Sequence, residues 1–180
     1  MNRFALFTDV SVNPQRKVGV GGYLLVPLSF LEQEPHTVVQ GAVSNLLKTR
    51  KFEETSSTKL ELQTVLWALD DVLEELTGSS CGSLQIYTDS QCVAGILARR
   101  AALTNADFIA KRSGQPLAHA PLYRAFYAKY DQLGFQLIKV AGHASTHTHD
   151  TVHRIFSYVD RDVRKELKIL TTALNADMQE

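Results

Sequence analysis

Two acidic residues of this chain directly follow apolar runs. Asp9 closes the run that begins at Phe4, and Asp89 closes the run that begins at Leu84; in both places an aromatic residue and a threonine precede the acid. Each run is typical of a buried strand, and the C-terminal ends of neighbouring parallel strands meet at the edge where open α/β sheets bind ligands. Two carboxylates brought together there repel each other unless a proton or a cation lies between them. We therefore expect these two acids to share a cation.

Two further acids border the apolar faces of expected helices. Glu61 precedes Val65 and Leu69 at helical spacing, and Asp160 follows Phe156 at the same spacing. Each acid also has a structural explanation, as a strand-end or capping residue, a first-turn residue favoured by the helix dipole, or a salt-bridge partner. Those separate explanations do not account for four acids converging on one sheet edge, where hard oxygen ligands suit Mg²⁺ or Mn²⁺ rather than zinc. Two such ions, roughly 3.5–4 Å apart, can promote phosphodiester hydrolysis by water.

A mixed α/β sheet is needed to bring these acids together. Periodicity predicts the strands Phe4–Thr8, Val18–Val26, His36–Val43, Leu84–Thr88 and Phe135–Val140. It predicts the helices Ser56–Leu76, Ser90–Arg99, Leu122–Leu133 and Val152 to about Leu170, with 101–121 irregular. Short connections make the first three strands an antiparallel meander, while helical crossovers make strands one, four and five parallel. The expected fold is a five-stranded mixed sheet with helices packed on it.

Composition limits the class of protein. The 180 residues predict a single domain over 1–180, with about 171–180 frayed. No apolar run suits a membrane span and no signal peptide is recognised, so no membrane partner is expected; two cysteines suit a reducing cytoplasm. Net charge is zero, but 53–75 carries seven acids and one base, whereas 99–129 carries six bases and one acid. The basic segment could bind a polyanion, or the charge could be a solvated, uneven surface.

Five short motifs resemble a known family when they are taken in order. They are Phe7-Thr8-Asp9-Val10-Ser11, Lys59-Leu60-Glu61-Leu62, Tyr87-Thr88-Asp89-Ser90-Gln91, Lys139-Val140-Ala141-Gly142-His143 and Val159-Asp160-Arg161. Together they resemble the successive motifs of type 1 ribonuclease H, in the ribonuclease H-like superfamily, and the resemblance runs from about residue 4 to residue 167. It implies a ribonuclease H-like fold and a hydrolase that cleaves the RNA strand of RNA–DNA hybrids, leaving a 3′-hydroxyl and a 5′-phosphate.

The resemblance also implies roles for the catalytic residues. Asp9 would bridge two Mg²⁺ ions (Mn²⁺ being possible), and Glu61 and Asp89 would complete the site on the leaving-group side. Asp160 would hold the ion that activates the water. His143 would assist proton transfer or product release. The partner would be the hybrid duplex, recognised through the 2′-hydroxyls of its RNA strand and bound by a monomer.

Five further residues are expected to bind the substrate. Ser57 and Gln91 match family positions that approach the minor groove of the hybrid. Ser11 belongs to the first motif. Arg99 and Arg100 open the region where many relatives carry a basic handle, here without their tryptophans.

The chain departs from the family pattern at several positions. Val10 replaces a usual glycine, Ser57 replaces a common asparagine, and Phe156-Ser157 stands where Asn-Glu usually precedes the last aspartate. The interval from His143 to Asp160 is longer than usual, so Asp150 is a rival for the fourth metal ligand.

Three alternatives stay open. His143, His147, His149 and His153 are dense enough to bind zinc, although a polar loop without that role is the other reading. The same scaffold could cleave DNA or structured RNA instead of a hybrid. It could also be a nucleic-acid-binding module whose active site is vestigial.

Overall fold

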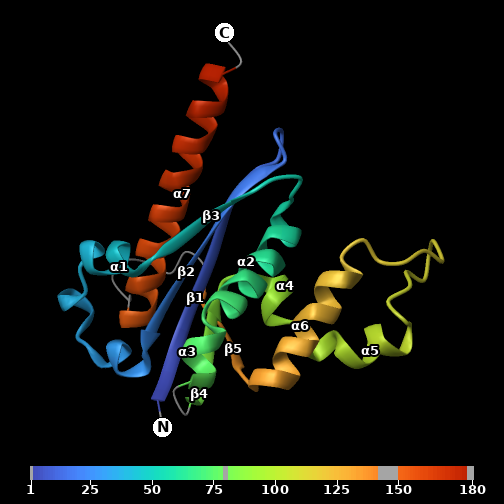
Figure 1. Ribbon diagram of the computed structural model, residues 1–180, viewed down its shortest axis with the longest axis horizontal. Helices are drawn as coiled ribbons and strands as arrows, with labels where there is room; N and C mark the ends of the chain where they lie inside the picture. The colour runs from blue at the N-terminus through green and yellow to red at the C-terminus, as the bar shows by residue number, and fades with distance from the viewer. Residues whose placement is uncertain (1, 79–80, 142–149, 178–180) are drawn as a thin grey trace.

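The computed structural model describes residues 2–78, 81–141 and 150–177 and contains one five-stranded sheet (Figure 1). Its strands are β1 (Asn2–Asn13), β2 (Val18–Pro27), β3 (Lys48–Phe52), β4 (Cys81–Thr88) and β5 (Gln136–Lys139), in the order β3-β2-β1-β4-β5. The pairs β1–β2 and β2–β3 are antiparallel, and the pairs β1–β4 and β4–β5 are parallel. The predicted mixed sheet is therefore confirmed.

Helices cover both faces of the sheet (Figure 1). The α-helices are α1 (Gln40–Leu46), α2 (Ser57–Asp71), α3 (Leu73–Gly78), α4 (Gln91–Ala94), α5 (Arg100–Asn105), α6 (Ala120–Leu133) and α7 (Thr151–Asp177). The short 3₁₀ helices are η1 (Leu28–Glu32), η2 (Pro35–Thr37) and η3 (Leu97–Arg99). None of the helices in the described ranges is long and apolar enough to cross a bilayer.

The hydrophobic core forms two layers because side chains alternate along β1. Leu6 belongs to the layer shared with Leu62 of α2 and Phe126 of α6. Phe7 belongs to the layer on the other face, shared with Val159 of α7. Because α2 and α7 pack on opposite faces of β1, they flank the residues that follow Phe7.

Glycines in β2 let both helices approach the sheet closely. A Cβ at Gly21 would lie 2.1 Å from Thr64 Oγ1 of α2, and a Cβ at Gly22 would lie 2.4 Å from Val163 Cγ2 of α7. Since Asp9 pairs with Gly22 across the sheet, this close packing occurs beside the first candidate acid.

The prediction of a third strand at His36–Val43 was wrong. Residues 36–43 end η2 and begin α1, and the strand that pairs with β2 is Lys48–Phe52. Pro35 starts the 3₁₀ turn, and the apolar residues Val38 and Val43 pack toward α7 instead of a neighbouring strand. The true strand is an exposed edge, so its residues are mostly polar and give little hydrophobic signal.

Four of the predicted helical regions also differ from expectation, and the helix expected over Ser90–Arg99 is instead the short α4 followed by η3. The first long helix breaks at Val72, where α2 ends and α3 begins. The stretch expected to be irregular contains α5, and α6 begins at Ala120. The last helix continues to Asp177, so the expected frayed end is helical from 171 to 177, because this part contains no glycine or proline to end it.

Candidate active site

Three acids from different elements meet at one edge of the sheet. Asp9 lies on β1, Glu61 lies on the second turn of α2, and Asp89 directly follows β4. One carboxylate oxygen from each lies within 4.8 Å of the others. The parallel pairing places Phe7 beside Tyr87, so the acids two residues farther along each strand emerge together. Ser56 caps α2 by accepting a hydrogen bond from Lys59 N at 3.4 Å, which fixes the helical turn that carries Glu61.

Burial and mutual repulsion raise the pKa of two of these acids. Asp9 is 4% exposed, and its burial, together with the charges of Asp89, Asp160 and Glu61, raises its pKa from 3.8 to about 9. Burial and the charge of Asp89 raise the pKa of Glu61 from 4.5 to about 8. Without a counter-ion, this edge of the sheet therefore holds protons at neutral pH.

The donor set fits a divalent cation. Within the described part of the chain, Asp9 Oδ2 and Glu61 Oε2 are buried and have no hydrogen-bond partner. Carboxylate oxygens are the preferred ligands of Mg²⁺ and Mn²⁺, and buried oxygens that lack a partner gain most from a cation. Asp9, Glu61 and Asp89 are thus the residues that could hold such an ion.

Asp160 lies at the margin of this cluster. It sits on α7, close enough for its charge to raise the pKa of Asp9, but outside the group of three oxygens within 4.8 Å. Arg164 Nε donates to Asp160 Oδ1 at 2.8 Å. If Asp160 is the fourth metal ligand, the ion would either replace Arg164 as the partner of this carboxylate or share the carboxylate with it.

The rival acid, Asp150, has a structural task at the start of α7. Its Oδ1 accepts a hydrogen bond from His153 N at 2.9 Å and lies 2.7 Å from His153 Nδ1. Its carbonyl oxygen accepts from Arg154 N at 3.0 Å. These contacts are those of an N-cap residue. The charge of Asp150 acts on Tyr87, whose pKa is raised chiefly by burial, and it is not among the causes that raise the pKa of Asp9 or of Glu61.

The expected substrate-binding residues near the cluster lie on its rim. Ser57 begins α2 and is exposed, and Ser11 lies on β1 opposite Val20. Gln91 begins α4, two residues after Asp89, and its Oε1 accepts a hydrogen bond from Lys139 Nζ of β5. Sequence reasoning gave Lys139 no role, although its place at the carboxyl end of β5 is a signal that could have found it.

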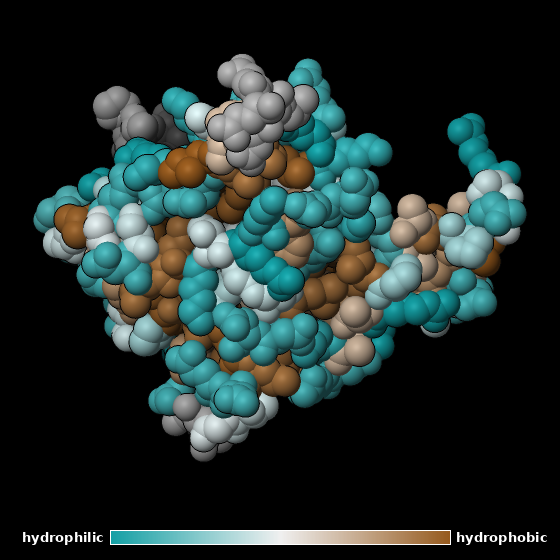
Figure 2. Space-filling model, turned by 45° about the horizontal axis from the view of Figure 1, so that its top comes forward, coloured by the Kyte–Doolittle hydropathy of each residue, from teal (hydrophilic) through white to brown (hydrophobic). Residues whose placement is uncertain are grey.

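The two arginines expected to bind substrate make internal contacts. Arg99 Nη2 donates to the carbonyl oxygen of Cys92 at 2.9 Å, and its guanidinium lies over the ring of Tyr123. Arg100 forms a bidentate pair with Asp131, at 2.5 and 2.6 Å. Both anchor the start of the segment 100–119, which stands away from the body of the molecule in Figures 1 and 2.

Four histidines were singled out in the sequence. His143, His147 and His149 lie outside the described residues. His153 lies on the first turn of α7 beside Asp150.

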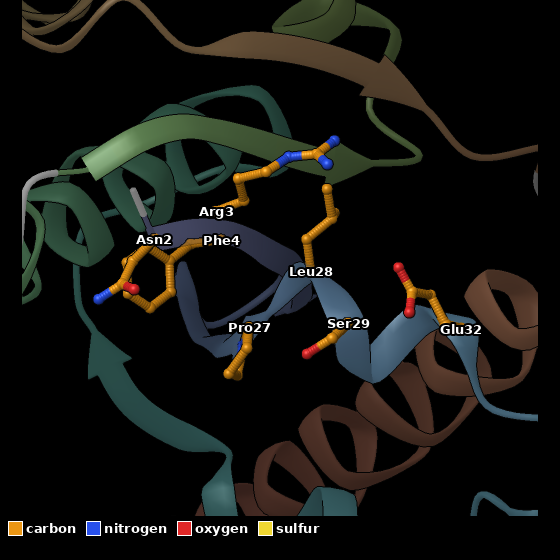
Figure 3. Close-up of a pocket in the computed structure, with 7 residues that line it drawn as sticks. All are labelled: Asn2, Arg3, Phe4, Pro27, Leu28, Ser29 and Glu32. Carbon is orange, nitrogen blue, oxygen red and sulfur yellow. The ribbon is translucent and has the colours of Figure 1, made fainter.

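A separate surface pocket lies at the other end of β1. It measures about 380 Å³ and lies between Arg3, Phe4 and η1, whose first residue Leu28 and last residue Glu32 line it (Figure 3). Asp9 lies seven positions after Asn2 on this strand, which corresponds to roughly 23 Å of extended chain. The pocket is therefore not part of the carboxylate cluster.

Comparison with known proteins gives one family and a shared fold. A family model described as RNase H matches residues 1–155. A structure of the foamy viral protease-reverse transcriptase in complex with dsDNA is similar, with a TM-score of 0.54 and 12% identity over 90% of this chain and 95% of that chain. A structure of the foamy viral protease-reverse transcriptase in complex with RNA/DNA hybrid has a TM-score of 0.58 and 12% identity, over 91% of this chain and 19% of that chain. No curated protein matches.

Proposed function

The chain belongs to the RNase H family, and from this premise we propose that it hydrolyses the RNA strand of RNA–DNA hybrids with the help of two divalent metal ions. The family makes it an endoribonuclease of the hydrolase class. Water would attack the phosphorus atom, the bond from phosphorus to the 3′ oxygen would break, and the products would carry a 3′-hydroxyl and a 5′-phosphate.

The observation that carries this proposal is the cluster of Asp9, Glu61 and Asp89 with its buried oxygens. One oxygen of each acid lies within 4.8 Å of the others, and two of the acids have buried oxygens without a hydrogen-bond partner among the described residues. A surface that only binds phosphate gains nothing from buried carboxylates, since these repel it. The cluster therefore favours an active nuclease over a vestigial binding module.

We assign the metal-binding role to four acids. Asp9, at the centre of the cluster, would contact both ions, while Glu61 and Asp89 would complete one site and Asp160 the other. Mg²⁺ or Mn²⁺ bound there would supply positive charge for the attacking and leaving oxygens of the phosphodiester. His143 would move a proton or help release the product.

The rim residues would position the hybrid. The hydroxyls of Ser11 and Ser57 and the amide of Gln91 are neutral groups that can hydrogen-bond to ribose 2′-hydroxyls, which is how a site tells RNA from DNA. Lys139 holds the Gln91 side chain in place. Arg99 and Arg100 would act by supporting the projecting segment 100–119, whose cations Lys111 and Arg112 are exposed.

The site needs residues from only one chain. Its acids lie on β1, α2, α7 and the end of β4, and both core layers lie within residues 4–170. We therefore propose that the protein acts as a monomer with a single domain. The cytoplasm is the compartment that we propose for it.

The test is cleavage of a labelled RNA–DNA hybrid in Mg²⁺. We expect Asp9→Asn and Asp89→Asn each to lower the cleavage rate by about 10³-fold or more, because each removes a charge on which metal-ion catalysis depends. Asp70→Asn is the matched control, since Asp70 is an exposed acid of α2 paired with Lys129. It should keep the wild-type rate.

Duplex DNA and duplex RNA serve as competing substrates in the same assay. Faster cleavage of either one than of the hybrid would replace the substrate proposed here. Equal behaviour of wild type and the two active-site variants, including no cleavage by any of them, would contradict the nuclease assignment.

A further inference from the structure

Residues 28–47, which we call the β2–β3 segment, run beside α7 instead of forming a short turn (Figure 1). The segment bonds to the first three turns of the helix. Thr151 Oγ1 donates to Gln33 O at 2.6 Å, Arg154 Nε donates to Val38 O at 3.0 Å, and Tyr158 OH donates to Val38 O at 3.4 Å. These donors recur at helical spacing, so the segment follows one stripe of α7.

Gln40 of this segment contacts the two residues that follow Asp160. Arg161 Nη1 donates to Gln40 Oε1 at 2.8 Å, and Gln40 Nε2 donates to Asp162 Oδ1 at 2.8 Å. Ser44 Oγ donates to the other carboxylate oxygen of Asp162. One side-chain amide thus uses its donor and its acceptor on neighbouring positions of α7.

This arrangement limits how α7 can move. Successive residues of a helix point about 100° apart, so bonds to Arg161 and Asp162 together oppose both rotation and sliding of the helix. The packing of Val163 against the Cα of Gly22 opposes movement from the other side. Asp160 directly precedes these restrained positions on α7, so the position of its carboxylate follows the axis and rotation of the helix.

The position of a metal ligand must be accurate. Mg²⁺ requires near-ideal octahedral geometry, with oxygens at about 2.0–2.1 Å. A small rotation of a helix moves its carboxylates by several tenths of an ångström, which is large on that scale. Asp160 needs this support more than Asp9 and Asp89 do, since those two acids are held by the hydrogen-bonded sheet.

We propose that Gln40 is a positioning residue for Asp160, acting through Arg161 and Asp162. The inference rests on the proposed function, because it gives Gln40 a role only if Asp160 binds metal. The competing explanation is that these bonds only stabilise the β2–β3 segment. The two explanations differ in what a Gln40 variant does to metal dependence.

The first experiment compares Gln40→Ala with Gln33→Ala. Gln33 lies in the same segment, but its side-chain amide donates to Phe30 O at 3.0 Å, within the segment. We expect Gln40→Ala to raise the Mg²⁺ concentration for half-maximal cleavage by about 3–10-fold and to lower kcat, with KM for the hybrid unchanged. Gln33→Ala should leave all three at wild-type values.

Thermal melting of both variants separates positioning from folding. A fall in Tm without a change in the Mg²⁺ midpoint of Gln40→Ala would overturn the proposal, as it would show a structural role alone. Similar shifts of the Mg²⁺ midpoint in Gln40→Ala and Gln33→Ala would overturn it as well.

A rescue experiment tests the bonds themselves. Gln40→Glu keeps the acceptor for Arg161 but places a carboxylate against Asp162, so we expect it to raise the Mg²⁺ midpoint. Adding Asp162→Asn supplies a donor to the new carboxylate, and the double variant should return to within about 2-fold of the wild-type midpoint. A double variant no better than the worse single variant would contradict the proposed geometry.

Calorimetric titration with Mg²⁺ and Mn²⁺ distinguishes a wrong role for Gln40 from a wrong assignment of the protein's function. If the wild type binds metal and cleaves the hybrid while Gln40→Ala matches it, the positioning role is wrong and the proposed function stands. If the wild type neither binds metal nor cleaves, the proposed function is wrong, and the role of Gln40 is wrong with it.

Discussion

The two sides of the candidate site are built differently. Asp9, Glu61 and Asp89 are held by paired strands and a capped helix, and burial together with the charges of neighbouring acids raises the pKa of Asp9 to about 9 and that of Glu61 to about 8. Asp160 sits on α7, paired with Arg164, and depends on the β2–β3 segment for its surroundings. The three-acid side is therefore rigid and carries mutually repelling carboxylates. On the α7 side, Arg164 neutralises Asp160, and the β2–β3 segment positions the helix that carries it.

The two sides should respond differently to a bound metal ion. An ion at the three-acid side would relieve the repulsion among acids that the sheet and α2 hold close together. At the α7 side, an ion must compete with Arg164 for the carboxylate of Asp160. The affinity of the site for the metal ion and the placement of the ion within the site should therefore depend on different residues.

The largest effect that tests this comparison is on catalysis at the α7 side. We expect Asp160→Asn to slow cleavage of the hybrid by about 10–100-fold, since one charged ligand is lost while three remain. Asp150→Asn should stay within about 2-fold of wild type, because asparagine also caps helices well. The measurement is kcat at saturating Mg²⁺ for both variants. A larger loss in Asp150→Asn would transfer the ligand role to Asp150.

The next effect is on stability without metal, where the two sides should respond oppositely. The unfolded Asp9 carboxyl titrates near 3.8 and the folded one at about 9, so the folded state binds more protons between these values and loses stability as pH rises through this window. At pH 8 with chelator, Asp9→Asn should therefore raise the free energy of unfolding by about 1–3 kcal/mol.

The same denaturation experiment includes Asp160→Asn as the matched variant. It loses a partly exposed ion pair with Arg164, so it should leave the free energy of unfolding unchanged or lower it by up to about 1 kcal/mol. The advantage of Asp9→Asn should vanish below about pH 4, where the Asp9 carboxyl is protonated in both the folded and the unfolded state. An advantage that persists there would mean that charge repulsion is not its cause.

The smallest effect concerns the support of Glu61. Ser56→Ala removes the cap of α2 and should lower the free energy of unfolding by about 1 kcal/mol. Thr58→Ala, an exposed first-turn change on the same helix, is the control and should stay within about 0.5 kcal/mol of wild type. Urea denaturation measures both. If Ser56→Ala and Thr58→Ala lowered the free energy of unfolding equally, the Ser56 cap would not be a cause of the rigidity of the three-acid side.

The three-acid side could be predicted from the sequence because its signals are local. Asp9 and Asp89 directly follow buried strands, and parallel pairing brings strand ends together without further information. Glu61 lies beside the apolar stripe of a helix whose cap is readable in Ser56. The order of the five motifs along the chain indicated the family, and the family model that matches residues 1–155 supports that prediction.

The α7 side could be predicted only in part. Asp160 borders an apolar face, but its distance from the cluster depends on how α7 is placed by residues more than a hundred positions earlier. The apolar residues Val38 and Val43 suggested a strand, and only the packed structure shows that they turn toward α7. No local pattern indicates that the amide of Gln40 bonds to Arg161 and Asp162.

The strand missed by sequence reasoning carries a consequence for how the protein behaves in solution. β3 is one edge of the sheet, and its cations Lys48, Arg50 and Lys51 are exposed. An open edge presents unpaired backbone groups on which another chain can add, and a row of positive charges makes that addition unfavourable. The polarity that hid this strand from hydrophobic patterning thus protects the folded protein from edge-to-edge aggregation.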